Sequence, residues 1–183
     1  NAQPIADCFR AVCEQLGRRP HFVYMSPQGA VLTQHRAREL AQLPELCVLC
    51  GHYEGVDERV IDALVDEQIS IGDYVLTGGE LPALVLIDCI ARMVDGVLSD
   101  EVCFTDESHY SGLLEYPQYT RPAVWEGRQV PEILLSGHHA NIEEWRRMQS
   151  IERTFRRRPE LLEKADLSKK EKLFVQSLEK MED

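Results

Sequence analysis

The chain has 183 residues, and 44% of them are hydrophobic, which is enough to bury a core and to form one or two domains. No apolar run reaches the ~18 residues that a membrane-spanning helix needs, and no signal-peptide pattern is present, so the sequence predicts a cytoplasmic protein with no membrane partner. The formal net charge of −11 argues against indiscriminate binding to nucleic acids.

Apolar spacing and capping residues predict six helices, at residues 4–16, 33–41, 56–66, 80–94, 141–158 and 168–181. Strands are predicted between the first four helices. Three apolar runs lead into glycine-containing turns, namely residues 21–25, residues 46–50 and the run that starts at Ser70 and precedes Gly78. This pattern predicts an α/β fold with a parallel sheet, whose loops gather at one edge and bind a small ligand there.

The composition changes between Asp95 and Gly112, where Gly, Ser, Asp and Glu dominate. We therefore predict an α/β domain over residues 1–98, a flexible linker over residues 99–112 and a smaller, mainly helical domain over residues 113–183. Six cysteines occur, and only Cys47 and Cys50 form a C-x-x-C pair. Their apolar surroundings favour a buried strand over a zinc or redox site, because a second pair of metal ligands is missing.

Four motifs closely resemble those of the bacterial tRNA (guanine-N1) methyltransferases of the TrmD family. They are residues 51–60 (GHYEGVDERV), residues 71–82 (IGDYVLTGGELP), residues 119–122 (YTRP) and residues 134–140 (LLSGHHA). The family belongs to the SPOUT superfamily, whose members fold into a deep trefoil knot, and the resemblance covers essentially the whole chain. General folding rules favour an open sheet because threaded backbones are very rare, so the knot is what the resemblance implies.

The resemblance implies transfer of a methyl group from S-adenosylmethionine to N1 of the guanine at tRNA position 37, beside the anticodon. It also implies a homodimer whose active site uses both subunits, and a Mg²⁺ ion in the reaction, although the sequence shows no Mg²⁺-ligand cluster. Family members have a strand, a helix and a glycine-rich loop before the position of Asn1. The resemblance thus implies a chain that lacks an N-terminal segment, and leaves its own catalytic competence open.

The resemblance also assigns the methyl-donor pocket to three loops. These are Tyr24, Met25, Ser26, Pro27 and Gly29 in the first loop, Gly51 and Glu54 in the second, and Ile71, Gly72, Asp73, Tyr74, Val75, Leu76, Gly78, Gly79 and Pro82 in the third. Glycines suit such a pocket because a Cβ atom would occupy the space of the ligand. The alternative is that these are ordinary turns between strands and helices.

Arg92 follows Asp88 by four residues on an otherwise apolar helix, so the two could form a simple ion pair. The resemblance instead implies that Arg92 stabilises negative charge on guanine O6 while N1 loses its proton. The family takes that proton with a linker aspartate. Counting back from Gly112 places Glu107 at this position, and Asp106 could replace it if the loop shifts by one residue, so the base remains open between them.

Basic residues concentrate near the C-terminus. Residues 141–183 hold 11 basic and 10 acidic side chains, whereas residues 1–140 hold 9 and 21. We predict that Arg121, Arg146, Arg153 and Arg157 contact tRNA phosphates, with a solvated helix face as the alternative. Four residues are predicted as the apolar stripe of the same helix, namely Ile142, Trp145, Met148 and Phe155. His138 and His139 would precede the helix cap Asn141 and serve as capping or RNA-contact residues rather than metal ligands.

Overall fold

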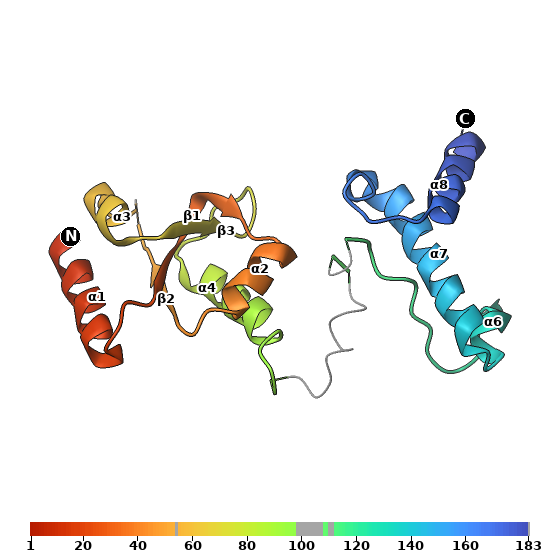
Figure 1. Ribbon diagram of the computed structural model, residues 1–183, viewed down its shortest axis with the longest axis horizontal. Helices are drawn as coiled ribbons and strands as arrows, with labels where there is room; N and C mark the ends of the chain where they lie inside the picture. The colour runs from red at the N-terminus through yellow and green to blue at the C-terminus, as the bar shows by residue number, and fades with distance from the viewer. Residues whose placement is uncertain (54, 98–107, 110–111, 183) are drawn as a thin grey trace. The chain divides into compact units, whose positions relative to one another are not determined.

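The computed structural model describes residues 1–53, 55–97, 108–109 and 112–182 of the chain (Figure 1). The chain divides into two compact units, Asn1–Glu101 and Val102–Asp183. The predicted linker at residues 99–112 lies almost entirely outside the described residues. Within the described part of the chain, no helix has both the length and the apolar character needed to cross a membrane.

The first unit is an α/β structure, as predicted. Its elements are α1 (Ala2–Leu16), β1 (His21–Val31), α2 (Gln34–Ala41), β2 (Leu46–Cys50), α3 (Glu58–Leu64), β3 (Glu67–Ser70) and α4 (Glu80–Ala91). The three strands form a parallel sheet in the order β2-β1-β3. Because the strands are parallel, the loops that follow them meet at one edge of the sheet.

Helices cover both faces of this sheet (Figure 1). On one face α1 packs with α3, and Phe9 of α1 stacks on Phe22 of β1 with 4.0 Å between the ring centroids. On the other face α2 packs with α4, where Leu40 and Leu86 join Val23 and other buried apolar residues in the core. Successive residues of β1 therefore face opposite helical layers, which explains why residues 22–25 are buried on both faces.

The third strand differs from the prediction. It spans Glu67–Ser70, and the run after Ser70 is an irregular loop rather than a strand. The chain turns there because the Ser70 hydroxyl accepts a hydrogen bond from Gly72 N–H (3.1 Å) and donates to the Gly72 carbonyl (2.9 Å). Helix α3 is shorter than the predicted helix at residues 56–66. It begins after Asp57, because the Asp57 carboxylate caps it by accepting a 3.0 Å hydrogen bond from Arg59 N–H.

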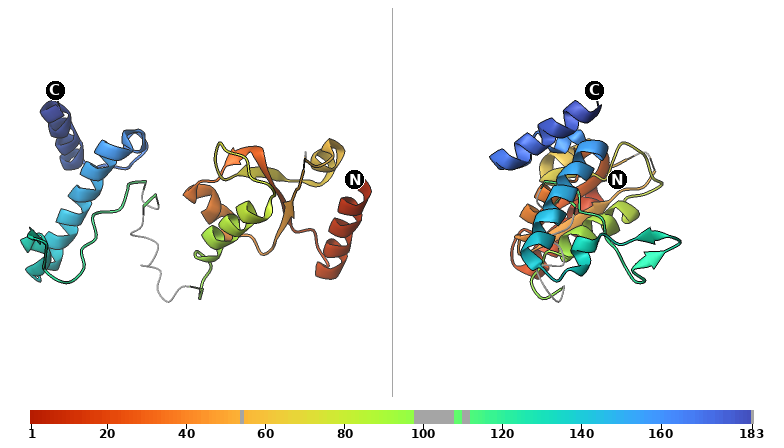
Figure 2. Two further views of the ribbon diagram at one scale, coloured as in Figure 1. Left: turned by 180° about the vertical axis from the view of Figure 1, so that it is seen from behind. Right: turned by 90° about the vertical axis from the view of Figure 1, so that its right-hand side faces the viewer.

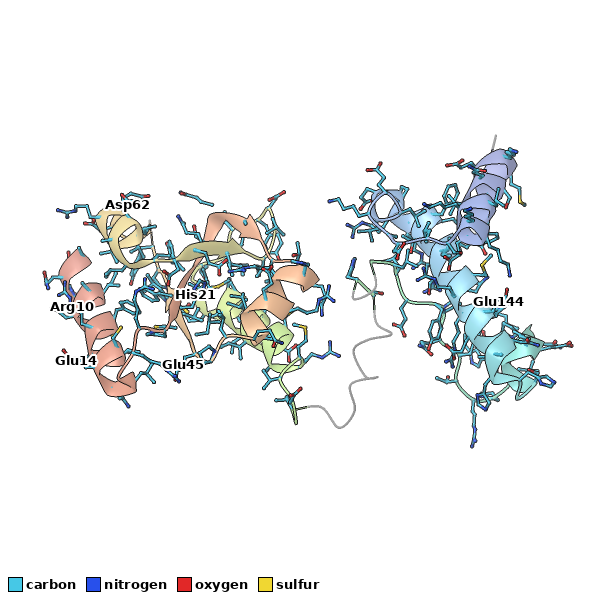
Figure 3. The ribbon with its side chains drawn as sticks, in the orientation of Figure 1. Arg10, Glu14, His21, Glu45, Asp62 and Glu144 are labelled. Atoms are coloured by element: carbon cyan, nitrogen blue, oxygen red, sulfur yellow. The ribbon has the colours of Figure 1, made fainter. Side chains whose placement is uncertain are left out.

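Ion pairs hold the amino-terminal ends of the strands, where Figure 3 labels His21. The guanidinium of Arg36 donates two hydrogen bonds to Glu67, and His21 Nε2 lies 2.6 Å from Glu67 Oε1. Burial alone would raise the pKa of Glu67, but the bonds from Arg36 and His21 outweigh it and lower that pKa. This network lies at the end of the sheet opposite to the loops that follow the strands.

The second unit is mainly helical. Its elements are β4 (Val124–Trp125), β5 (Arg128–Gln129), α6 (Glu132–Leu135), α7 (His139–Arg157), the 3₁₀ helix η1 (Pro159–Leu161) and α8 (Lys169–Glu182). The β4–β5 hairpin, drawn as a short two-stranded arm in the right-hand view of Figure 2, was not predicted. Its turn is Glu126-Gly127, and both residues have positive φ angles, of 49° and 78°. This geometry is that of tight two-residue hairpin turns.

The two long helices of this unit were predicted, with different details. Helix α7 begins at His139 because the His138 carbonyl accepts the first helical bond, from Ile142 N–H (3.0 Å), so Asn141 is not its cap. Ser168 caps α8 as predicted. Its hydroxyl accepts from Glu171 N–H (3.3 Å), and the Glu171 carboxylate accepts from Ser168 N–H (2.7 Å), which is a capping box.

The buried stripe of α7 is also shifted from the prediction. The buried residues are Ile142, Ser150, Ile151 and Thr154, whereas Trp145, Met148 and Phe155 are half-buried. Thr154 can be buried because its hydroxyl donates to the Ser150 carbonyl (2.6 Å) and accepts from Leu114 N–H (2.9 Å). Ile151 packs with Leu113 and Leu167 to form the core of the unit.

Candidate functional site

A cavity of about 260 Å³ lies where the three strands of the first unit end. Small-molecule sites usually enclose ~300–1,000 Å³, so this cavity is close to the lower end of that range. Many residues that were predicted to bind the methyl donor line it, namely Tyr24, Met25, Ser26, Pro27, Gly51, Ile71, Tyr74, Val75, Leu76, Gly78, Gly79 and Pro82. Further lining residues were not predicted, namely Gln28, His52, Tyr53, Gly55, Ile69, Ser70 and Thr77.

The wall of the cavity is a contact between the end of β2 and the turn before α4. The Gly79 N–H donates to the Gly51 carbonyl (2.9 Å), and His52 and Gly78 form an antiparallel β-bridge. A Cβ atom on Gly79 would lie only 2.8 Å from Cys50 Cα. Gly79 is therefore needed for the two backbones to approach, whereas a Cβ atom on Gly51 would lie 3.0 Å from the hydroxyl oxygen of Tyr24. Polar backbone groups lie beside apolar side chains at this wall.

A histidine–carboxylate hydrogen bond spans the same contact. His52 Nε2 lies 2.5 Å from Glu80 Oε1, at the first residue of α4. The backbone N–H of Glu80 lowers the pKa of its own carboxyl group, and His52 lowers it further, although burial acts in the opposite direction. Sequence reasoning missed His52, whose only signal was its position inside the motif of residues 51–60.

Three predicted pocket residues do not line the cavity. A Cβ on Gly29 would lie 2.4 Å from the backbone of Gln68, so this glycine allows β1 to pass closely over β3, where the strand register shifts. Gly72 has a φ of 148° and serves the turn after β3. Asp73 is in the same turn but is not among the lining residues. Glu54 lies outside the described residues.

Arg92 is the C-cap of α4 and is half-buried, and its backbone N–H donates to the Asp88 carbonyl (3.3 Å). Asp88 itself is exposed. The reason is that α4 covers the sheet with one side only. Its other side exposes large apolar residues, namely Leu81, Leu84, Val85 and Ile87. The two candidate bases, Glu107 and Asp106, lie outside the described residues.

The four predicted RNA-binding arginines do not share one environment. Arg146 donates to Glu143 (2.9 Å) and places its guanidinium carbon 4.7 Å from the centre of the Tyr116 ring. Arg153 is half-buried, whereas Arg121 and Arg157 are exposed. The arginines of α7 therefore combine structural contacts with exposed charge, rather than forming one uniformly solvated face.

The C-x-x-C pair lies in strand β2, as predicted. Cys47 and Cys50 are half-buried, and burial raises the pKa of both thiols, which keeps them protonated at neutral pH. Across the ranges that the structure describes, no group of three or more His, Cys, Asp or Glu side chains is arranged to hold a metal ion.

Comparison with known proteins agrees with the motif analysis. Residues 1–164 match the family model described as tRNA (Guanine-1)-methyltransferase TrmD. A tRNA (guanine-N(1)-)-methyltransferase of Ruminiclostridium cellulolyticum is 62% identical over 162 residues, which cover 88% of this chain and 70% of the relative. The proteins of the same name from Alkaliphilus oremlandii and Alkaliphilus metalliredigens are 52% and 54% identical, covering 96% and 97% of this chain and 73% of each relative. The chain therefore belongs to the TrmD family of tRNA (guanine-1)-methyltransferases.

Proposed function

We propose that the chain transfers a methyl group from S-adenosylmethionine to N1 of the guanine at position 37 of tRNA. Family membership supports the reaction. The observation that carries the proposal is the cavity at the carboxyl ends of β1, β2 and β3, because the family motifs of residues 51–60 and 71–82 both contribute to its lining. A site at this edge of a parallel sheet is where α/β proteins usually bind small ligands.

The lining residues fit the methyl donor. Gly51 and Gly79 leave backbone groups accessible where a side chain would fill the space, and Ile71, Leu76 and Pro82 supply apolar surface for a flat base. When bound, S-adenosylmethionine supplies an electrophilic methyl group. The residues of the chain would hold it in one orientation and exclude water from the transferred methyl.

We also propose that the first unit has the deep trefoil knot of the SPOUT superfamily. Support comes from the direct backbone contact between Gly79 and Gly51, because it brings the loop before α4 against the end of β2. A knot threads one of these loops through the other. Helical residues 113–183 would then serve as the tRNA-binding domain, with Arg121, Arg146, Arg153 and Arg157 as candidates for phosphate contacts.

For the chemistry, we propose that Glu107 or Asp106 takes the proton from guanine N1 and that Arg92 stabilises the charge left on O6. A guanidinium near O6 would stabilise the guanine anion and so make N1 more acidic, and loss of the N1 proton to the carboxylate would give N1 the electron pair that attacks the methyl group. The described residues contain no metal-ligand cluster, so no step is assigned to Mg²⁺.

We further propose a homodimer with a shared active site, located in the cytoplasm. The exposed apolar side chains of α4 support an association between copies. Leu81 and Leu84 are each 60% exposed, and Ile87 is 50% exposed, which is unusual for neighbouring leucine and isoleucine side chains on one helix. Burial of this surface by a second copy would remove it from water.

The test is to incubate the chain with tritiated S-adenosylmethionine and an unmodified tRNA transcript, and then to analyse the nucleosides. The proposal expects N1-methylguanosine, and no label in a transcript that carries adenine at position 37. A label on a ribose hydroxyl would indicate a different methyltransferase. Binding of tRNA without any transfer would indicate a non-catalytic RNA-binding protein.

A further inference from the structure

His52 lines the candidate donor cavity, but its hydrogen-bond partner belongs to another element. The residue follows β2, and its Nε2 atom lies 2.5 Å from Oε1 of Glu80, the first residue of α4. We propose that His52 is a positioning residue for the methyl donor, because its bond to Glu80 holds the Gly78-Gly79 turn in the shape that the donor requires. We call this bond the His52–Glu80 clamp. The inference rests on the proposed function, which makes S-adenosylmethionine the ligand of the cavity.

The turn that the clamp holds consists of two glycines. Neither Gly78 nor Gly79 has a side chain that restricts its backbone, and glycine loses more conformational freedom on ordering than any other residue. One backbone hydrogen bond, from Gly79 N–H to the Gly51 carbonyl (2.9 Å), ties the turn to the end of β2. A β-bridge between His52 and Gly78 is the second link. The clamp joins the same two segments through side chains and is therefore a third link across one short contact.

Both side chains of the clamp lie directly against the turn. A Cβ atom on Gly78 would lie 2.5 Å from Glu80 Oε2 and 2.7 Å from His52 Cε1, so glycine leaves the room that the two side chains occupy. The side chains of His52 and Glu80 are 53% and 55% exposed, so the hydrophobic core does not depend on them. Removal of either side chain should therefore alter the turn more than the stability of the fold.

The hydrogen of the clamp can be assigned to His52. The backbone N–H of Glu80 and the His52 ring lower the pKa of the Glu80 carboxyl group, so the group is ionised at neutral pH and can only accept. Nε2 of His52 therefore carries the hydrogen and donates it. Hydrogen bonds to an ionised group are stronger than neutral ones. The clamp thus requires a donor at the position of Nε2, which the amide of a glutamine can approach and that of the shorter asparagine cannot.

A turn that is already ordered binds a ligand more tightly, because less conformational entropy is lost on binding. The two members of the clamp differ in their access to that ligand. His52 lines the cavity, whereas Glu80 is not among the described lining residues. Loss of donor affinity on removal of Glu80 would therefore act through His52 and the turn, and not through a lost contact with the donor.

Calorimetry of S-adenosylmethionine binding to the whole chain tests the clamp. His52→Asn and Glu80→Ala should each weaken binding by about 5- to 20-fold, the scale of a half-exposed hydrogen bond to a charged group. The double variant should lose no more than either single variant, because both remove the same bond. Normal affinity in Glu80→Ala, or losses that add in the double variant, would overturn the proposal.

His52→Gln is the conservative variant that keeps an N–H donor near the position of Nε2. It should bind S-adenosylmethionine at least about threefold more tightly than His52→Asn. This comparison decides the question even if Glu80→Ala does not fold. Equal affinities of the glutamine and asparagine variants would overturn the clamp, because a bond from the position of Nε2 would then have no effect on the turn.

His35 supplies the matched control. It is an exposed histidine of α2, and its Nδ1 atom lies 3.6 Å from the carboxylate of Glu39 in the same helix. Neither residue is among the described lining residues of the cavity. His35→Asn should therefore keep the donor affinity within about twofold of wild type. An equal loss of affinity in His35→Asn and His52→Asn would overturn the assignment to His52.

Methyl transfer to tRNA separates the clamp from the proposed function. In a chain that methylates tRNA, His52→Asn should raise the KM for the donor more than it lowers kcat, because the clamp acts on binding. A normal donor KM in both His52→Asn and Glu80→Ala would overturn the clamp alone. Donor binding that depends on His52 and Glu80, in a chain that transfers no methyl group, would overturn the proposed reaction and leave the clamp.

Discussion

The backbone N–H of Gly79 donates a 2.9 Å hydrogen bond to the carbonyl oxygen of Gly51, and this bond fixes the turn before α4 to the end of β2. An added Cβ at Gly79 would meet Cys50 Cα at 2.8 Å and Gly51 N at 2.9 Å. Because these atoms are backbone atoms, they cannot rotate away as a side chain could. The shape of the candidate donor cavity therefore depends on this contact.

Gly79→Val should abolish binding of S-adenosylmethionine, because the new side chain separates the two loops or fills the space between them. The measurement is the rise in melting temperature on adding the donor, which stabilises only the folded state that binds it. Ala11→Val, at an exposed position of α1, is the matched control and should keep the full rise. A Gly79→Val protein that binds the donor normally in calorimetry would show that the turn is not the pocket wall.

Glu171 should contribute to stability in a pH-dependent way. The hydrogen bond from Arg147 (2.7 Å) lowers its pKa to about 2, against the opposing effect of burial. Because the pKa of Glu171 is lower in the folded chain than its ordinary value of 4.5, the ionised carboxylate stabilises the fold at pH values above 4.5. This contribution is lost as the pH falls from 4.5 toward 2. Arg147 is 37% exposed, so solvent screening reduces the expected loss for Glu171→Gln to ~1–2 kcal/mol at pH 7.

Urea unfolding at pH 7 and at pH 2 measures this effect. The difference between wild type and Glu171→Gln should shrink at pH 2, where about half of the wild-type carboxylate is protonated because its pKa is about 2. Glu179→Gln, an exposed position on the same helix, should change stability by less than ~0.5 kcal/mol at either pH. A loss for Glu171→Gln that does not vary with pH would assign the role of Glu171 to packing or to the helix cap alone.

Replacement of both Arg153 and Arg157 by alanine should weaken tRNA binding and reduce its dependence on salt. Log affinity falls as log salt concentration rises, and each lost phosphate contact makes this fall less steep by up to ~1 in slope. The control is the double variant Arg10→Ala and Arg59→Ala, which removes two exposed charges from α1 and α3. If the slope is the same in both double variants, Arg153 and Arg157 belong to a solvated helix face.

The identity of the base can be decided by two conservative variants. Glu107→Gln should reduce turnover by ~10²–10⁴-fold, the usual contribution of a positioned general base, whereas Asp106→Asn should cost little. Donor binding should persist in both, because the described residues that line the cavity are unchanged. The reverse ranking would make Asp106 the base, and nearly normal turnover in both would show that neither carboxylate takes the proton.

Helices and strands could be predicted from the sequence where their side chains follow a simple apolar pattern. Strand β2 matches its apolar run because Leu46–Cys50 is uniformly hydrophobic and is bounded by Pro44 and Gly51. Strand β3 was placed too late, because Glu67 and Gln68 do not look like strand residues. Glu67 is accommodated there by Arg36 and His21, which lie far from it in sequence. Pairing of this kind cannot be read from local periodicity.

The same limit applies to the sites. The predicted pocket residues came from the family resemblance, and the structure brings most of them to one cavity. Gly29 instead lies where β1 passes closely over β3, and Gly72 lies in the turn after β3, and neither is among the lining residues. Ser150 and Thr154 were missed as core residues because their hydrogen bonds, rather than their polarity, decide their burial. The hairpin that carries Trp125 and Arg128 has strands of only two residues, too short for an alternating pattern.

The most direct test of the central claim is ultraviolet cross-linking of tritiated S-adenosylmethionine to the chain, followed by mapping of the labelled peptides. The account predicts label in the loop of Tyr24–Gln28 or in that of Tyr74–Gly79, competed by the demethylated product of the donor and lost in Gly79→Val. Label confined to the second unit, or label that survives both competition and the substitution, would contradict the claim that the cavity at the ends of the strands holds the methyl donor.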